Sequence, residues 1–278
     1  MPLGFPAEGF DSGLRYEPHR GDIFVCTYPK CGTTWMQYIV YLLVHDARPL
    51  GRGESLSDVF PHLEEVGREA VEALPPPRLI KTHLPRPMAP YGADARYIHV
   101  ARNPFDCAVS FFHHTRGFPK HYDFAAGRFE DFFECFIRGE VDFGDYFEHL
   151  VTWYELAGAE NVLFLTYEQM KSDARAAIIE VAEFLGAAAI ATVADPEKLE
   201  RIRHASSFSS MRRDQRRWSS ARPAEMPAFV RKGAVGDWTN LFTREQARRL
   251  AERFADATMG SPAAALWPDV VATARRLS

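Results

Sequence analysis

The sequence predicts a single α/β domain over residues 1–278, with a P-loop-like central parallel β-sheet that carries helices on both faces. Short runs of β-branched and aromatic residues alternate with amphipathic helical patterns, which is typical of right-handed βαβ units. The chain has 278 residues and 46% hydrophobic content, enough to bury one full core. We see no internal repeat that would favour a solenoid.

Each element is predicted by its own pattern. Four apolar runs predict strands at 22–26, 78–83, 96–102 and 161–167, and the first three end near a Pro or an Asn-Pro turn. Helical periodicity or capping residues predict helices at 33–44, 104–112, 129–137, 147–157 and 176–185. The helix at 129–137 carries a stripe of Phe at helical spacing, which we expect to lie in the core.

Composition and charge exclude several classes of partner. A net charge of −4 argues against nucleic-acid binding. The N-terminus shows no secretory pattern, and the apolar runs are too short to span a membrane. The four cysteines show no C-x-x-C pairing, so we expect reduced thiols, no metal site and a cytoplasmic location.

Two segments near the C-terminus differ from the rest. Residues 211–229 are rich in Arg and interrupted by Pro223 and Pro227, so we expect a long mobile lid. The tail at 259–278 shows no pattern that assigns it a role.

The most informative segment is T-Y-P-K-C-G-T-T-W at 27–35, between a predicted strand and a predicted helix. Backbone N–H groups at such a helix start converge on one point, which suits a phosphate or another oxyanion. Lys30 adds positive charge there, and Thr33 and Thr34 add hydroxyl donors. An ATP-binding Walker loop has its Lys after the second Gly, whereas Lys30 precedes Gly32. The anion is therefore not expected to be ATP with magnesium.

Cys31 lies in this loop, beside Lys30 and the start of the helix. Both neighbours would lower the pKa of a thiol, so a reactive Cys31 is a minor hypothesis.

A second cluster follows the next strand. Lys81 and His83 end the strand at 78–83, and ligands of parallel sheets bind beyond the carboxyl ends of the strands. The loop of Lys30 lies at the same edge. We therefore expect Lys30, Lys81 and His83 in one cleft.

Six separated motifs, taken together and in order, resemble those of the cytosolic sulfotransferases. They are the loop at 27–35, K-T-H-L-P at 81–85, R-N-P-F-D-C-A-V-S at 102–110, Y-E-Q-M at 167–170, S-S-F-S-S-M at 206–211 and R-K-G-A-V-G-D-W at 231–238. This family transfers a sulfuryl group from 3′-phosphoadenosine 5′-phosphosulfate to an acceptor hydroxyl or amine. The resemblance implies that donor, with the 3′,5′-bisphosphate as product.

The resemblance also implies the catalytic roles. His83 would be the general base, while Lys30 and Lys81 would stabilise the departing phosphosulfate. Such transfer needs in-line positioning, positive charge on the oxygens that gain charge, and a base that titrates near neutrality. A His in this position, where the heparan-type enzymes have Glu, favours the branch that acts on small acceptors.

The same resemblance implies the nucleotide site. Arg102, Ser110, Arg231 and Lys232 would bind the 3′-phosphate, and Trp35 and Phe208 would stack on the adenine. The full implied set is Lys30, Cys31, Gly32, Thr33, Thr34, Trp35, Arg102, Ser110, Tyr167, Ser206, Phe208, Met211, Phe229, Arg231, Lys232 and Gly233.

The acceptor pocket is placed only by analogy. Its expected lining favours a flat, phenolic or other aromatic small molecule, although each Phe could equally be a core residue. The residues are Phe60, Lys81, His83, Phe112 and Phe143, with Phe111, His113 and Tyr16 as further candidates. Phenol, catecholamine and steroid acceptors all remain open.

The chain departs from the family pattern in two places. Cys31 replaces the usual Ser of the loop, and the dimer motif expected at 239–248 keeps only Thr243. Arg244 and Arg248 stand where Val and Glu are usual, so we expect a monomer or a dimer through another surface. Two alternatives, a P-loop kinase and a non-catalytic nucleotide-binding protein, are disfavoured. A P-loop kinase would need a Walker Lys, which this chain lacks. A non-catalytic protein would be expected to have lost His83 or Lys81, and this chain has both.

Overall fold

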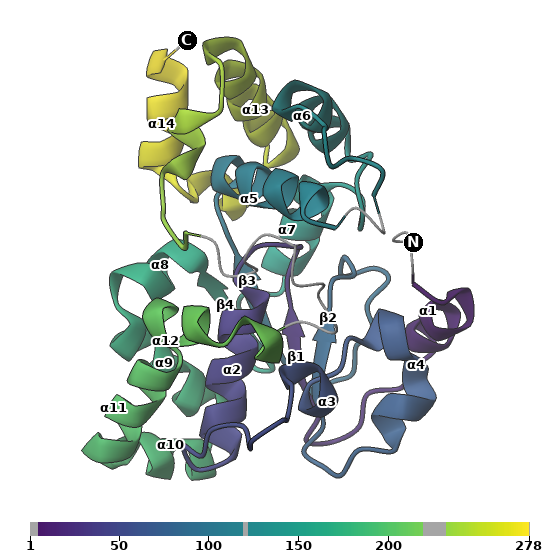
Figure 1. Cartoon of the computed structure of the whole chain (residues 1–278), viewed down its shortest axis with the longest axis vertical. Helices are drawn as coiled ribbons and strands as arrows, with labels where there is room; N and C mark the ends of the chain where they lie inside the picture. Colours follow the sequence, from purple (N-terminus) through teal and green to yellow (C-terminus); the bar gives the residue numbers. More distant parts are fainter. Residues whose placement is uncertain (1–4, 119–121, 219–231, 278) are drawn as a thin grey trace.

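A computed structural model describes residues 5–118, 122–218 and 232–277. A four-stranded, fully parallel sheet stands at its centre, with the strand order β2-β1-β3-β4 (Figure 1). The strands are β1 (Ile23–Cys26), β2 (Leu79–Thr82), β3 (Arg96–Ala101) and β4 (Val162–Thr166). The expected α/β fold is confirmed, and each strand lies within one residue of its predicted bounds.

Helices cover both faces of the sheet, because alternate strand residues point to opposite sides. Ile23 and Val25 pack in one cluster with α2 (Thr33–Val44) and α9 (Ala174–Leu185). Phe24 packs in another cluster with Trp153 of α7 (Tyr146–Tyr154). Burying each such side chain stabilises the fold by roughly 1.5–3 kcal/mol.

A third cluster lies beyond the carboxyl ends of the strands (Figure 1). It joins α5 (Pro104–Arg116), α6 (Phe129–Arg138), α13 (Arg244–Ala257) and α14 (Pro268–Leu277). The Phe stripe of α6 is buried in this cluster, which confirms the expected core role. This layer of helices covers the carboxyl edge of the sheet, where the sequence motifs meet.

Several short helices lie outside the sequence predictions. Near the N-terminus these are α1 (Ala7–Leu14), α3 (Leu56–Val59) and α4 (Leu63–Glu72). Gly67, at φ +77°, interrupts the helical backbone of α4, which lies in a segment rich in Gly, Pro and Glu. The others are α8 (Tyr167–Ser172), α10 (Ala187–Ala194), α11 (Pro196–Ala205), α12 (Phe208–Arg213) and the 3-10 helices η1 (Gln215–Arg217), η2 (Asp237–Asn240) and η3 (Pro262–Ala265).

The first part of the expected lid at 211–229 packs against the rest of the domain, and its mobility stays a prediction. Met211 lies in α12 and is buried, and η1 leads into Trp218, which is also buried. Trp218 Nε1 donates to Met211 O at 2.6 Å, and its ring packs on Tyr38 with centroids 4.8 Å apart. These two apolar side chains fix residues 211–218 against α2 despite the Arg-rich sequence. Residues 219–229 lie outside the described part of the chain.

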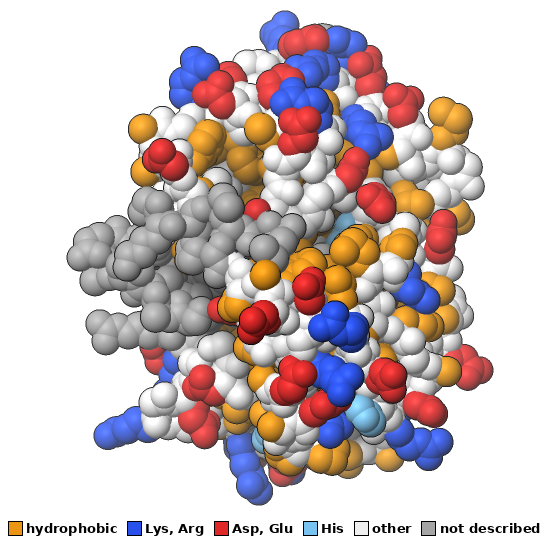
Figure 2. Space-filling model, turned by 90° about the vertical axis from the view of Figure 1, so that its right-hand side faces the viewer, with side chains coloured by type: hydrophobic (Ala, Val, Ile, Leu, Met, Phe, Trp, Pro, Cys, Tyr) orange, Lys and Arg blue, Asp and Glu red, His pale blue; other side chains and the backbone are white. Residues whose placement is uncertain are grey.

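Within the described residues, no helix has the length and apolar character needed to cross a bilayer. On the face drawn in Figure 2, acidic and basic side chains are interspersed instead of gathering into one basic patch. A nucleic-acid binder usually concentrates its positive charge on one surface.

Candidate active site

The anion loop is shaped by backbone conformations that few residues adopt. Gly32 caps the N-terminus of α2 at φ +103°, and Lys30 also has a positive φ of 71°. A Cβ at Gly32 would lie 2.9 Å from the Tyr167 ring. This position therefore requires glycine both for its positive φ and for the close approach of that ring. Thr33 begins the helix, and its Oγ1 lies 2.5 Å from Thr27 Oγ1. The turn thereby presents the N-terminus of α2 at the carboxyl edge of the sheet.

The minor hypothesis of a reactive Cys31 is wrong. The side chain is fully buried, and its Sγ lies 3.7 Å from Cys107 Sγ. Burial, followed by the neighbouring Cys107, raises the pKa of the Cys31 thiol well above its ordinary value. The effect of burial exceeds that of the nearby positive charge, so the thiol of this expected donor-site residue faces the core.

His83 follows β2 and is held in one tautomer. Its Nδ1 lies 2.6 Å from Thr27 O, and a carbonyl oxygen can only accept, so Nδ1 carries the proton and Nε2 is left as an acceptor. Burial and the charge of Lys81 lower the pKa of His83 well below its usual range. The Phe143 ring lies edge-on, with centroids 5.0 Å apart. A neutral imidazole with a basic Nε2 is the state that a general base requires.

Two residues that the sequence did not single out support His83. Glu64 of α4 is fully buried, and its Oε1 accepts from His83 N at 2.8 Å and from Thr82 Oγ1 at 2.6 Å. Its Oε2 lies 3.1 Å from Nε2 of His62, whose ring stands edge-on to His83 at 4.8 Å. Burial alone would raise the pKa of Glu64. The contacts with His62 and Thr82 lower this pKa by more than burial raises it, so the carboxylate stays charged. An acidic residue in the first turn of a helix is common, so no sequence signal marked this one.

Lys81 lies within the field of the same carboxylate. Burial lowers the pKa of Lys81, and Glu64 and Glu65 oppose that shift. Because Lys81 in turn depresses the pKa of His83, the charges of this edge are coupled.

Arg102 connects the anion loop to the segment that precedes η2. Its Nη1 donates to Lys30 O at 3.3 Å and its Nη2 to Ala234 O at 2.9 Å, and its guanidinium lies 4.5 Å over the Tyr167 ring. Its Nε is buried without a hydrogen-bond partner among the described residues, which fits a site for an anion. Lys30 Nζ lies 3.4 Å from His114 Nδ1.

The residues expected around the adenine form two contacts. Trp35 stands edge-on to Tyr167 at 5.6 Å, and within the described chain its Nε1 is buried without a partner. Gly233, at φ +59°, lies against Phe208, since a Cβ there would come within 2.6 Å of the ring. Phe208 therefore packs on the last motif, and its stacking on the adenine stays a prediction.

The last motif is tied to α5 by Asp106. Its carboxylate accepts from Gly236 N at 2.7 Å and Trp238 N at 3.1 Å. Lys232 differs from expectation, because its ammonium lies 2.8 Å from Asp237. Phe229 and Arg231 fall outside the described residues.

Other expected site residues are either packed in the core or half-buried on their helices. Ser206 donates to Ile202 O at 2.8 Å, and Met211 is part of the core under α2. Phe60 is 1% exposed and belongs to the same core. Phe111 and Phe112 pack on α6, His113 is half-buried in α5, and Ser110 and Thr34 are half-buried on α5 and α2. Of the expected acceptor-pocket Phe residues, Phe143 is the one in ring contact with His83.

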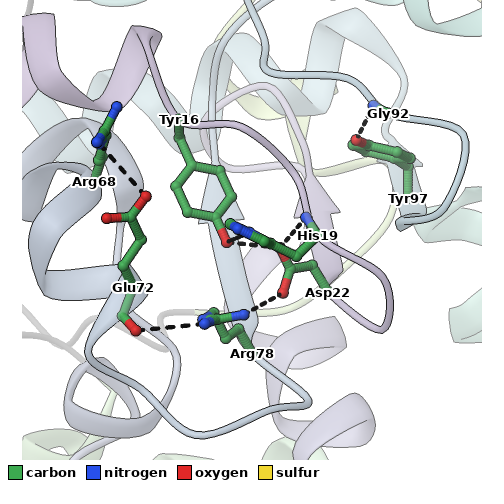
Figure 3. Close-up of polar contacts among 8 residues, drawn as sticks. All are labelled: Tyr16, His19, Asp22, Arg68, Glu72, Arg78, Gly92 and Tyr97. Atoms are coloured by element: carbon green, nitrogen blue, oxygen red, sulfur yellow. Dashed lines mark hydrogen bonds and ion pairs between the residues drawn. The ribbon is translucent and has the colours of Figure 1, made fainter.

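Tyr16 as an acceptor-pocket residue is wrong. Its hydroxyl donates to Asp22 Oδ2 at 2.6 Å, and Asp22 directly precedes β1, at the amino edge of the sheet (Figure 3). Arg78 lies 3.4 Å from the other oxygen of Asp22. The whole cluster in Figure 3 therefore belongs to the edge opposite His83.

The described residues contain no group of three or more His, Cys, Asp or Glu that could hold a metal ion.

The sulfotransferase domain family model matches residues 20–262. The chain belongs to the sulfotransferase family.

Individual sulfotransferases are similar to this chain over most of its length and most of their own. Rabbit (Oryctolagus cuniculus) sulfotransferase 1C2 is 36% identical over 255 residues, which cover 86% of this chain and 83% of the relative. Human sulfotransferase 6B1 is 31% identical over 261 residues, covering 92% and 82%. The structure of mouse sulfotransferase SULT7A1 complexed with PAP has a TM-score of 0.72 at 26% identity, covering 99% and 95%. Retinol dehydratase in complex with androsterone and inactive cofactor PAP has a TM-score of 0.75 at 25% identity, covering 92% and 84%.

Proposed function

We propose that this sulfotransferase moves a sulfuryl group from 3′-phosphoadenosine 5′-phosphosulfate to a hydroxyl or amine of a small, aromatic acceptor, with His83 as general base. The observation that carries the proposal is the 2.6 Å contact between His83 Nδ1 and Thr27 O, which leaves Nε2 to accept a proton at the edge of the sheet where the Lys30 loop lies. Family membership and similarity to complexes that hold PAP support the donor.

The side chains supply what the reaction requires. The donor contributes the sulfuryl group. Nε2 of His83 takes the proton of the acceptor hydroxyl, so the oxygen attacks as it loses that proton. Lys30 and Lys81 provide positive charge for the oxygens that gain charge in the transition state.

The donor would be held at three places. Backbone N–H groups at the start of α2 suit the 5′-phosphosulfate, because a helix N-terminus favours an anion. Arg102, whose Nε has no partner within the described part of the chain, suits the 3′-phosphate, together with Ser110, Arg231 and Lys232. Binding the phosphate would require Lys232 to leave Asp237, an exchange of one charge-assisted contact for another.

The acceptor is argued only from its surroundings. Phe143 beside His83 supports a flat acceptor ring, while a neighbouring structure that holds androsterone makes a steroid alcohol a reasonable class to test.

We also propose that the protein is cytoplasmic and is a monomer, or a dimer through a surface other than the segment at 239–248. Arg248 is paired with Glu245 and Glu252 of its own helix, both at 2.6 Å, so it is already neutralised and offers no charge to a second chain. Sedimentation at micromolar concentration tests the monomer, and a stable dimer that Arg244→Glu dissociates would contradict it.

An acceptor screen tests the activity. The full chain is incubated with the sulfate donor and a panel of phenols, catecholamines, steroid alcohols and amines, and products are read by mass. We expect a gain of one sulfuryl group on at least one phenolic acceptor without added divalent metal. Phosphoryl transfer from ATP with magnesium, and none from the sulfate donor, would instead favour a kinase.

A further inference from the structure

The C-terminal segment makes a direct contact with the donor side of the site. Trp267 lies between η3 and α14, beyond the residues 20–262 that match the family model. Its indole Nε1 donates to Glu168 Oε2 at 2.8 Å. The ring is 9% exposed and packs on Phe254 of α13, with centroids 6.1 Å apart. The tail is therefore fixed to the body of the domain and to Glu168 at once.

Glu168 links Trp267 to α5, because its carboxylate also binds Asn103. It follows Tyr167 at the start of α8, and its Oε1 accepts from Asn103 Nδ2 at 2.7 Å and from Asn103 N at 3.1 Å. Asn103 in turn caps α5, since its Oδ1 accepts from Asp106 N at 2.9 Å. The sequence neighbours of this pair, Tyr167 and Arg102, are in contact at 4.5 Å. The carboxylate thus holds together the two backbones that carry them.

The chain of hydrogen bonds continues to the last motif. Asn103 Nδ2 also donates to Asp106 Oδ2 at 3.0 Å, and Asp106 holds the backbone N–H groups of Gly236 and Trp238. One connected network therefore runs from Trp267 to the segment that carries Lys232 and Gly233. A network whose members are all satisfied fixes a single arrangement.

The backbone of Trp267 supports a constrained role. Its φ of +52° is unfavourable for a bulky residue. Such a conformation persists where the surrounding contacts determine it. Here those contacts are the hydrogen bond to Glu168 and the packing on Phe254.

We propose that Trp267 is a positioning residue for the donor nucleotide: through Glu168 and Asn103 it fixes Tyr167 and Arg102, and it thereby sets the affinity for the 3′,5′-bisphosphate. The proposal rests on the donor assigned under the proposed function. It gives the tail at 259–278 a role that the sequence alone left open.

Calorimetric binding of 3′-phosphoadenosine 5′-phosphate to the full chain tests the role. Trp267→Phe keeps an aromatic ring against Phe254 but removes the N–H, and we expect the Kd to rise about five- to twenty-fold. Acceptor KM should stay within about two-fold, because the acceptor contacts another part of the site. The matched control is Tyr91→Phe, which removes a 3.0 Å hydrogen bond to Asn161 at the amino edge of the sheet and should leave the Kd unchanged.

Two further arms separate positioning from general damage. Glu168→Gln preserves side-chain size and should raise the Kd in the same direction, and combining it with Trp267→Phe should add little, because both act through one contact. If Trp267→Phe does not fold, Glu168→Gln alone carries the test. An unchanged Kd in the folded single variants would overturn the positioning role and leave the proposed function intact. Failure of the wild-type chain to bind the bisphosphate would overturn both.

Discussion

His83 shows how one backbone atom can decide the chemistry of a side chain. Thr27 O accepts from Nδ1, which leaves Nε2 to accept a proton, while Glu64 holds the backbone N–H of the same residue. The sequence placed His83, Lys81 and Lys30 at one edge because each lies at or just beyond the end of a recognisable strand. It could not predict Glu64 or the tautomer, because both depend on contacts between segments far apart in the chain.

The pH dependence of the reaction follows from the state of His83. Its neutral form is the active base, and its pKa is lowered by burial and by Lys81, so activity should persist below the ordinary imidazole pKa of about 6.5. We expect the acid limb of kcat/KM to lie below that pH. Lys81→Gln removes one cause of the shift and should move the limb upward, whatever it does to the maximal rate. An acid limb at or above pH 6.5 in the wild type would contradict this account.

At the scale of elements, strands were predictable and interrupted helices were not. The four strands are short and rich in apolar and β-branched residues, and the ends of β1, β2 and β3 are marked by a following Pro or Asn-Pro. In α4, Gly67 interrupts the helical backbone, and Met211 and Trp218 are buried within an Arg-rich stretch that was expected to form a lid. The composition of a sequence segment does not show which of its individual side chains will be buried in a core.

The anion loop gives a prediction at this scale. Gly32→Ala should lower the melting temperature and weaken bisphosphate binding, because the new Cβ meets the Tyr167 ring at 2.9 Å and the residue must keep φ +103°. The backbone conformation alone costs about 1–2 kcal/mol. Gly53→Ala is the matched control, since its φ is +86° and no atom of the described residues lies within 4 Å of the added Cβ. The control should lose stability but bind normally, and equal binding by both variants would argue against a tight loop.

At the scale of the whole molecule, three packed clusters surround the sheet, and several imidazoles are buried among them. Burial lowers the pKa of His62, His83 and His99, and lowers that of His149 to about 3. The fold and the three layers follow from the alternation in the sequence. The arrangement of His99 against His149, with ring nitrogens 3.5 Å apart, does not.

Stability should therefore fall as the pH drops. Below the unfolded imidazole pKa of about 6.5, the unfolded chain binds protons that these folded residues do not, so the free energy of unfolding decreases from pH 7 toward pH 5. Urea unfolding at several pH values measures the slope. His99→Phe should flatten it, whereas His204→Gln, an exposed position on α11, should not. A slope near zero between pH 7 and 5 would contradict the buried neutral histidines.

The central claim is that His83 removes the proton while other residues hold the donor. A single-turnover transfer assay on His83→Ala, with bisphosphate binding measured by calorimetry on the same sample, tests it most directly. We predict that transfer falls by about 10²- to 10⁴-fold, because a general base contributes that much, and that the Kd for the bisphosphate changes little. Transfer within a few-fold of the wild type would contradict the assignment of His83 as the base.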